Sequence, residues 1–377
     1  MTVDTTNNVP ENPEKEKIMK EDTPVDNGQT KEEAPASAEK VEEKVEEKKV
    51  ELSQPKPTVR KTNFEKDVVY LYQFPRNPLL PSTSSFCLKV ETWLRLAGIK
   101  YENVDHRAKY RSKKGQLPFV ELNGEEIADS TFIIKELSEK YNKDLDAALS
   151  PEQRVISHAM ISMIENHLSW VILWWRAKYP DSVIKGYQLN LQNALNTRLP
   201  NSILNFCYKF TYGRKGMKKA KAHGIGVHSQ DEIIEFGKND LRVLSDLLAD
   251  RPFFFGDEPT LLDVVAFSNL AQLHFIDKEV EHPLRDVMNE SFPNLVGLVS
   301  RIKERAFLDW DDICTTLDLN SHLPKPVKEV KETKEGTGPA EKQPLPDEPE
   351  KGKGDEKEME KEPEEKKEKE NENEKEK

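Results

Sequence analysis

The pair Leu117-Pro118, which precedes a short apolar run, is suited to binding a ligand. Proline cannot donate a ladder hydrogen bond, so Pro118 should begin a strand after a tight turn, for which a cis peptide bond is suitable. The backbone N–H and C=O of Leu117 would then be free. An extended ligand can pair with such groups as one more strand would.

A second pair, Asp129-Ser130, stands where a helix should begin, shortly after the hairpin signal Asn123-Gly124. Backbone N–H groups in a first helical turn have no partner within the helix, and the helix dipole adds a partial positive charge there. A carboxylate bound at this point would therefore be stabilised. Together the two pairs predict a site for an extended ligand with a carboxylate group.

The elements around these pairs follow a recognisable order. Strands are predicted at 68–74, 99–104 and 117–122 from their β-branched and aromatic residues. Hydroxyl residues at 82–85 precede apolar residues at helix spacing up to Gly98, and a further helix is predicted at 130–141. This order of strands and helices is that of a thioredoxin-like domain, with a mixed sheet and helices on its faces.

After residue 150 the pattern becomes all-helical. A capping box at 150–153 opens a long helix that should end near Tyr179, and a second box at 229–232 opens another. Thr260 caps a largely apolar helix, and Asp263 can reach back to the backbone of Thr260. We expect that helix to be the buried centre of a bundle.

Charged tails flank the predicted domains. Residues 1–62 hold 15 acids and 11 bases, residues 326–377 hold 19 acids and 13 bases, and neither segment has an aromatic residue. Such segments cannot bury enough apolar surface to offset the loss of chain entropy, so we expect them to be disordered. They would contact basic partners or a cytoskeletal surface, or only solvate the protein. The section between them is nearly neutral.

Cysteine usage and the lack of apolar spans indicate a cytosolic protein. Cys87, Cys207 and Cys314 are widely separated, so they match neither a disulfide framework nor a metal site. The longest apolar run, 170–175, is too short to cross a bilayer, and the amino terminus is too polar for a secretory signal. We expect neither a metal nor a transmembrane segment.

Several motifs resemble the glutathione transferase superfamily over roughly residues 66–315. They are Ser84-Ser85-Phe86-Cys87, Leu117-Pro118, Asp129-Ser130 and the run from Phe255 to Asp263. Further motifs at 71–76, 86–94 and 115–119 are similar to the failed axon connections family, which is related to metaxins. The resemblance implies an α/β thioredoxin-like domain at 66–142 and an all-α domain at 150–318, the glutathione transferase fold, between the disordered tails.

The resemblance also implies a ligand and roles for individual residues. Glutathione would be bound by Leu117, Pro118, Asp129 and Ser130. Ser84 falls where serine-type transferases keep the hydroxyl that stabilises the thiolate of glutathione, and Ser85 is the second choice. Helix capping explains both serines equally well. Tyr72 is a further hydroxyl candidate, although a strand tyrosine is more often part of the core.

Two other segments have alternative interpretations. Trp170 and Trp174 would line a hydrophobic substrate pocket between the domains, or they belong to the core. The segment 209–228 is interpreted as a basic, flexible, glycine-containing stretch that interrupts the helical domain. It would bind acidic lipid headgroups, a phosphoprotein or the chain's own acidic tails, or it is a solvated loop; it lacks the interleaved aromatic residues of a nucleic-acid platform.

Two functions follow from the resemblance. In the first, the protein binds glutathione and takes part in axon and neuronal development through its surface or tails. In the second, it is a cytosolic glutathione S-transferase that acts on hydrophobic electrophiles. The expected partners are glutathione, a second copy of the chain, and signalling or cytoskeletal proteins; nucleic acid is not expected. A metaxin-like role at a membrane is a third alternative.

Overall fold

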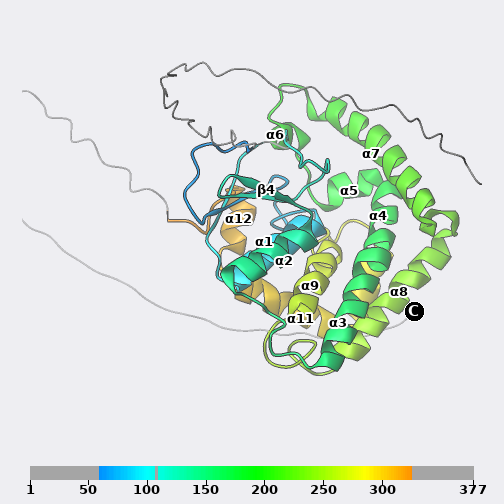
Figure 1. The fold of residues 1–377 in the computed structure, drawn as a ribbon. Coiled ribbons are helices and arrows are strands. Elements are labelled where there is room, and N and C mark those ends of the chain that lie inside the picture. Colours follow the sequence, from blue (N-terminus) through cyan, green and yellow to red (C-terminus); the bar gives the residue numbers. More distant parts are fainter. Residues whose placement is uncertain (1–58, 107–108, 325–377) are drawn as a thin grey trace, which may run out of the picture. The chain divides into compact units, whose positions relative to one another are not determined.

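The computed structural model describes residues 59–106 and 109–324, and its first half is built on a four-stranded sheet (Figure 1). The strands are β1 (Val69–Tyr72), β2 (Tyr101–Asn103), β3 (Phe119–Leu122) and β4 (Glu125–Ala128). Their spatial order is β2-β1-β3-β4; β1 and β2 are parallel and the other pairs are antiparallel. The predicted thioredoxin-like arrangement is therefore present.

Two helices pack with this sheet, as predicted. Helix α1 (Ser85–Leu96) is capped by Ser84, and the chain turns after it at Gly98, where φ is +67°. Helix α2 (Ser130–Tyr141) begins directly after the β3–β4 hairpin. That hairpin turns at Asn123-Gly124, and both residues have positive φ, the conformation that a tight two-residue turn requires.

The second half consists of helices. They are α3 (Pro151–Met163), the π-helix η1 (Ile164–Leu168), α4 (Ser169–Lys178), α5 (Pro180–Gly186), α6 (Leu191–Leu195), α7 (Asn201–His223), the 3-10 helix η2 (Ile225–Val227), α8 (Gln230–Leu248), α9 (Leu261–His274), α10 (Pro283–Ser291), α11 (Pro293–Ala306) and α12 (Trp310–Thr316). Capping boxes open α3, α8 and α9 at the predicted residues. The fold is thus that of the glutathione transferases, as the motifs implied.

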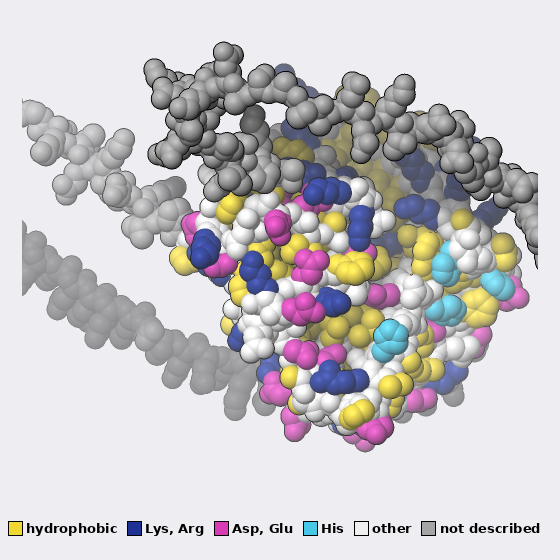
Figure 2. All heavy atoms as spheres, viewed as in Figure 1, with side chains coloured by type: hydrophobic (Ala, Val, Ile, Leu, Met, Phe, Trp, Pro, Cys, Tyr) yellow, Lys and Arg dark blue, Asp and Glu magenta, His cyan; other side chains and the backbone are white. Residues whose placement is uncertain are grey.

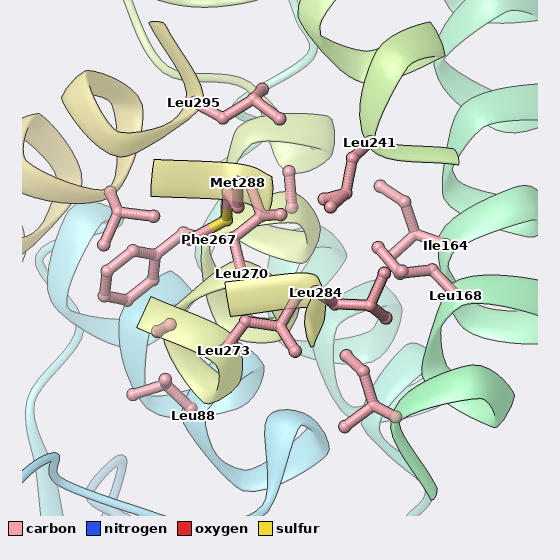
Figure 3. Close-up of a cluster of buried hydrophobic side chains, with 14 of the residues drawn as sticks. Leu88, Ile164, Leu168, Leu241, Phe267, Leu270, Leu273, Leu284, Met288 and Leu295 are labelled. Carbon is pink, nitrogen blue, oxygen red and sulfur yellow. The ribbon is translucent and has the colours of Figure 1, made fainter. Parts of the chain in front are cut away.

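Helix α9 is the buried centre of the helical half. Its side chains from Leu262 to Leu273 are all buried, and α1 lies against it (Figure 1). Figure 3 shows Phe267, Leu270 and Leu273 surrounded by side chains from η1, α8, α10 and α11, with Leu88 of α1 among them. Full burial of each such side chain stabilises the fold by about 1.5–3 kcal/mol. This core joins α1 to the helical half.

The proline-containing loop between β1 and α1 is fixed by the helical half. Leu80 is fully buried in the core around α9. The Asn77 side-chain amide donates to the Tyr187 carbonyl at 2.5 Å, and Arg176 donates to the Thr83 carbonyl at 2.7 Å. Because these contacts hold both ends of the loop, the residues that lead into α1 have a defined position.

Two segments differ from the expectations. Residues 59–62 were assigned to the amino-terminal tail, but the backbone N–H groups of Arg60 and Lys61 donate to the Glu121 carboxylate at 2.8 and 3.0 Å. The segment 209–228 is not a flexible interruption, because 209–223 lies within the long helix α7. The remaining parts of both predicted tails lie outside the described residues. No helix among the described residues is long and apolar enough to cross a membrane.

Candidate functional site

A cavity of about 170 Å³ lies where α1, α2 and the turn before β3 meet. It brings together all four residues predicted to bind glutathione, although Leu117 and Asp129 belong to different segments. The residues that line it are Phe86, Ser112, Lys114, Gln116, Leu117, Pro118, Asp129, Ser130, Thr131 and Glu165. The site therefore combines an extended backbone edge with a helix N-terminus.

The Leu117-Pro118 peptide bond is cis, and pairing with β1 starts only at Phe119. No hydrogen bond of the Leu117 backbone is found within residues 59–106 and 109–324. The turn in front of it is held by its own backbone, because Ser112 N donates to the Gln116 carbonyl at 3.0 Å. Leu117 is thus available to pair with an extended ligand.

Asp129 is the N-cap of α2 and has an unusual backbone conformation. Its φ is +89°, a backbone conformation that residues other than glycine rarely adopt. Such a conformation costs about 1–3 kcal/mol, and residues that adopt it cluster at ligand sites. The Asp129 carboxylate accepts from Thr131 N at 3.0 Å. The neighbouring Ser130 is buried and also lines the cavity. Because Ser130 is the first residue of α2, its N–H and hydroxyl lie at the positive end of the helix dipole.

Charged groups of both signs surround the cavity. The Lys89 ammonium pairs with Glu165 at 2.6 Å and lies 3.3 Å from the Thr131 hydroxyl. The Lys114 ammonium lies 4.5 Å from the ring centroid of Phe132, at the border with a second cavity of about 320 Å³. A ligand with both amino and carboxylate groups would find complementary charges here.

Ser84 and Ser85 do not line either of these two cavities. The Ser84 hydroxyl accepts from Cys87 N at 3.4 Å, which is the geometry of an N-cap, and the Ser84 backbone N–H donates to the Ser82 hydroxyl at 3.3 Å. Phe86, which follows the two serines, is the residue of this turn that reaches the cavity.

Tyr72 and Cys87 are buried beneath the site and are poorly suited to chemistry. Burial, with the hydrogen bond to Glu121, holds the pKa of Tyr72 well above its usual value. The Tyr72 ring stacks on Phe119 at 4.3 Å between centroids. Burial also raises the pKa of the Cys87 thiol to about 11, so little thiolate forms at neutral pH.

The two tryptophans assigned to a hydrophobic pocket or to the core have different surroundings in the helical half. Trp174 is buried in the core around α9, whereas Trp170 packs against that core and stacks on His223 at 4.1 Å. Neither is among the residues that line the two cavities. His167, on the same stretch, lies 2.7 Å from the Asp240 carboxylate. No cluster of His, Cys, Asp and Glu with a metal-binding arrangement is found in the part of the chain that the structure describes.

The sequence did not point to Phe86, Lys114 or Glu165 as residues of the site. In the sequence Phe86 is an apolar residue of a predicted helix and a member of the Ser84-Ser85-Phe86-Cys87 motif, and neither gives it a role in binding. Glu165 enters from η1 of the helical half and meets Lys89 of α1, which is distant in sequence, so no local pattern connects them. A search for acids and bases that could pair between the two halves would have been the available signal.

Comparisons of the sequence with known families agree with this architecture. The model of the glutathione S-transferase N-terminal domain matches residues 85–182, and the model of the C-terminal domain matches residues 237–302. A solved glutathione transferase from Phanerochaete chrysosporium has 15% sequence identity and a TM-score of 0.44, covering 65% of this chain and 100% of its own.

Three relatives are similar over most of the folded part. Failed axon connections from Drosophila melanogaster is 68% identical over 281 residues, which are 74% of this chain and 67% of that protein. An isoprene-epoxide glutathione S-transferase from Rhodococcus is 28% identical and covers 60% of this chain and 94% of its own. Metaxin-2 from Mus musculus is 26% identical, covering 64% of this chain and 89% of its own.

Proposed function

Because this chain belongs to the Failed axon connections family within the glutathione S-transferase superfamily, we propose that it binds glutathione and acts in axon development through contacts with other proteins. The observation that carries the first part is the single cavity lined by both Leu117-Pro118 and Asp129-Ser130. Glutathione is an extended tripeptide with a free amino group and two carboxylates. Its shape and charges suit this cavity.

The binding mode follows from the polar groups of the site. The peptide backbone of glutathione would pair with the N–H and C=O of Leu117, as an added strand does. One of its carboxylates would accept hydrogen bonds from the Ser130 N–H and hydroxyl at the start of α2. Typical ligand sites enclose about 300–1,000 Å³, so the cavity of about 170 Å³ would hold part of the tripeptide and leave the rest along Leu117.

The role in axon and neuronal development is proposed from the name of the Drosophila relative and its 68% identity. Signalling or cytoskeletal proteins that contact the surface or the tails, and a second copy of the chain, are the partners we propose. A reducing cytoplasm suits the three free cysteines. In this function the protein uses the transferase fold for recognition and does not need to turn over an electrophile.

An alternative is a catalytically active glutathione S-transferase that conjugates hydrophobic electrophiles. Two observations favour it: Ser84 stands at the N-terminus of α1, and one relative is named as an isoprene-epoxide glutathione S-transferase. Against it, the Ser84 hydroxyl caps the helix and lies outside the residues that line the cavity. Ser85 has the same position outside the cavity. Binding without turnover is therefore the better-supported proposal.

Calorimetric titration of the full chain with reduced glutathione tests the proposal. Ser130→Ala should weaken binding at least about tenfold, because a hydrogen bond to a charged group contributes about 1.5–3 kcal/mol. Ser138→Ala, at the other end of α2, is the matched control and should bind like the unchanged chain. Absence of binding by the unchanged chain would overturn the proposal.

The two candidate functions separate in the same experiment. If glutathione binds and its ultraviolet thiolate absorbance appears, but disappears in Ser84→Ala, the transferase reading is favoured. If binding occurs without a thiolate signal, and Ser84→Ala only lowers the melting temperature as the loss of a helix cap would, the protein binds glutathione without activating it. Turnover of an epoxide or an aryl halide by the unchanged chain would contradict the second outcome.

A further inference from the structure

Helix α7 presents one fixed face to solvent because its other face is pressed against α4. A Cβ atom added at Gly216 would lie 2.6 Å from the Ala177 Cβ, and one at Gly213 would lie 3.2 Å from the Ala177 carbonyl oxygen. Real Cβ contacts are almost never as short as the one at Gly216, and the one at Gly213 is tighter than most, so glycine at these positions lets the two helices approach closely. The opposite face of α7 therefore points away from the core.

Large apolar side chains are exposed on this outer face. The exposed fractions of Ile203, Phe206 and Phe210 are 49%, 70% and 57%. Residues three or four positions apart share one face of a helix, so these three form a continuous apolar stripe. Leu195 and Leu199, which precede the helix, are also about half exposed. Exposed contiguous apolar surface of this kind marks a site of interaction.

The apolar stripe continues directly into a basic cluster. Arg214, Lys218 and Lys221 follow Phe210 at the same three- or four-residue spacing, and Lys215 and Lys219 lie beside them. The Arg214 guanidinium lies 4.8 Å from the centroid of the Phe210 ring, which joins the two parts. In the described part of the chain none of these five cations has an ion-pair partner, whereas Lys209 pairs with Asp181.

The charge of α7 is unlike that of the rest of the fold. Its sequence from Asn201 to His223 contains six lysine or arginine residues and no acid, although residues 63–325 together are nearly neutral. Figure 2 shows dark blue side chains beside yellow ones over the region where Figure 1 draws α7. A helix that combines exposed aromatic residues with lysines and lacks acids matches the chemistry of an anionic lipid surface.

We propose that α7 lies against a membrane surface that contains anionic lipid. The apolar stripe of Ile203, Phe206 and Phe210 enters the boundary between headgroups and acyl chains, and the basic cluster contacts the anionic headgroups. The helix lies in the plane of the membrane and does not span it. Because Gly213 and Gly216 pack closely against Ala177, the binding face of α7 already exists in the fold before it meets the membrane.

Vesicle flotation of the full chain tests this inference. Vesicles of phosphatidylcholine with phosphatidylserine should carry the protein, and vesicles of phosphatidylcholine alone should carry much less. Lys218→Glu with Lys219→Glu should lower the partition coefficient at least about twentyfold, because each cation near an anionic surface contributes about fivefold. Phe206→Ser with Phe210→Ser should lower it at least about tenfold, since burial of two aromatic rings is lost.

Matched variants distinguish α7 from charge or hydrophobicity elsewhere. Lys135→Glu with Lys140→Glu makes the same change of charge on α2, and Val155→Ser with Leu308→Ser removes other exposed apolar groups; both should leave binding unchanged. Equal loss in these controls would overturn the inference. Equal binding of the unchanged chain to both kinds of vesicle would also overturn the inference. Absence of binding to either kind would overturn it as well, and is the result expected if the acidic tails or a second copy of the chain cover α7. Circular dichroism checks that each variant is folded.

Discussion

The side-chain amide of Asn320 pairs with the backbone of Asn103 through two hydrogen bonds. Asn103 N donates to Asn320 Oδ1 at 2.7 Å, and Asn320 Nδ2 donates to the Asn103 carbonyl at 2.9 Å. Asn103 belongs to β2, one of the two edge strands of the sheet. An unpaired strand edge is a template for aggregation, so the segment after α12 covers it in place of another strand.

Asn320→Ala should destabilise the fold by about 1–3 kcal/mol, because the two backbone groups of Asn103 lose their partners. Urea unfolding measures the change in the free energy of unfolding. Asn63→Ala, in an exposed loop, is the control and should change it little. Equal effects of the two substitutions would show that the pairing with the edge strand is unimportant.

A buried ion pair lies beside the same segment. Arg76 donates to both carboxylate oxygens of Glu91 at 2.6 Å, and both side chains are fully buried. Burial acts to raise the pKa of Glu91, but the charge and hydrogen bonds of Arg76, together with Arg95 and Gln73, outweigh it and hold the pKa well below its usual value. Arg76 also donates to the Leu319 carbonyl at 2.8 Å. The pair thus connects the proline-containing loop, α1 and the segment after α12.

Glu91→Gln should cost about 3–5 kcal/mol of stability, because it leaves the Arg76 charge buried without a partner. The double variant Arg76→Met with Glu91→Gln should cost less than the sum of the two single changes, and a double-mutant cycle measures the difference. Glu65→Gln tests an exposed pair, with Lys100, and should cost below about 1 kcal/mol. Additive effects at Arg76 and Glu91 would contradict this account.

Features that depend on local interactions were predictable from the sequence. The cis bond before Pro118, the helix start at Asp129-Ser130 and the capping boxes each follow from the chemistry of adjacent residues. Glu165 and Asn320 were not predictable in the same way, because their partners Lys89 and Asn103 are distant in sequence. Such contacts depend on how the two halves meet.

The interpretation of 209–228 as a flexible stretch was wrong for a specific physical reason. Glycine lowers helix propensity by about 1 kcal/mol, so Gly213 and Gly216 were taken as breaks in the helical domain. In the structure both face Ala177 of α4, which comes too close to Gly216 for any side chain and leaves little room for one at Gly213. Tertiary packing therefore overrides the local preference, and the same residues that suggested a loop hold a long helix in place.

The cysteines should differ sharply in reactivity. Burial raises the pKa values of both Cys87 and Cys314 to about 11, whereas Cys207 is exposed on α7. Iodoacetamide at neutral pH should modify Cys207 first, the partly exposed Cys314 more slowly, and the buried Cys87 only after unfolding, since the thiolate is the reactive form. Mass spectrometry of the alkylated peptides measures the order, and Cys207→Ser should remove the fast phase. Rapid modification of Cys87 in the folded protein would contradict its burial.

His282 is buried and electrically neutral at the start of α10. Burial lowers the pKa of its imidazole from 6.5 to about 3. Its Nδ1 accepts from Arg285 N at 3.3 Å, and its ring lies 4.0 Å from the Trp175 ring, between centroids. Because the unfolded chain binds a proton that the folded chain excludes, stability is complete above pH 6.5 and falls as the pH drops towards 3.

His282→Asn should therefore flatten the acid side of the stability profile. Asparagine keeps an N-cap acceptor for α10 but does not titrate. Between pH 6.5 and 5 the free energy of unfolding should therefore fall by about 2 kcal/mol less in the variant than in the unchanged chain. Urea unfolding at a series of pH values measures the slope, which is insensitive to any constant cost of the smaller side chain. Burial also lowers the pKa values of His106, His274 and His322, so part of the slope should remain. An unchanged slope in His282→Asn would mean that His282 accepts a proton in the folded state.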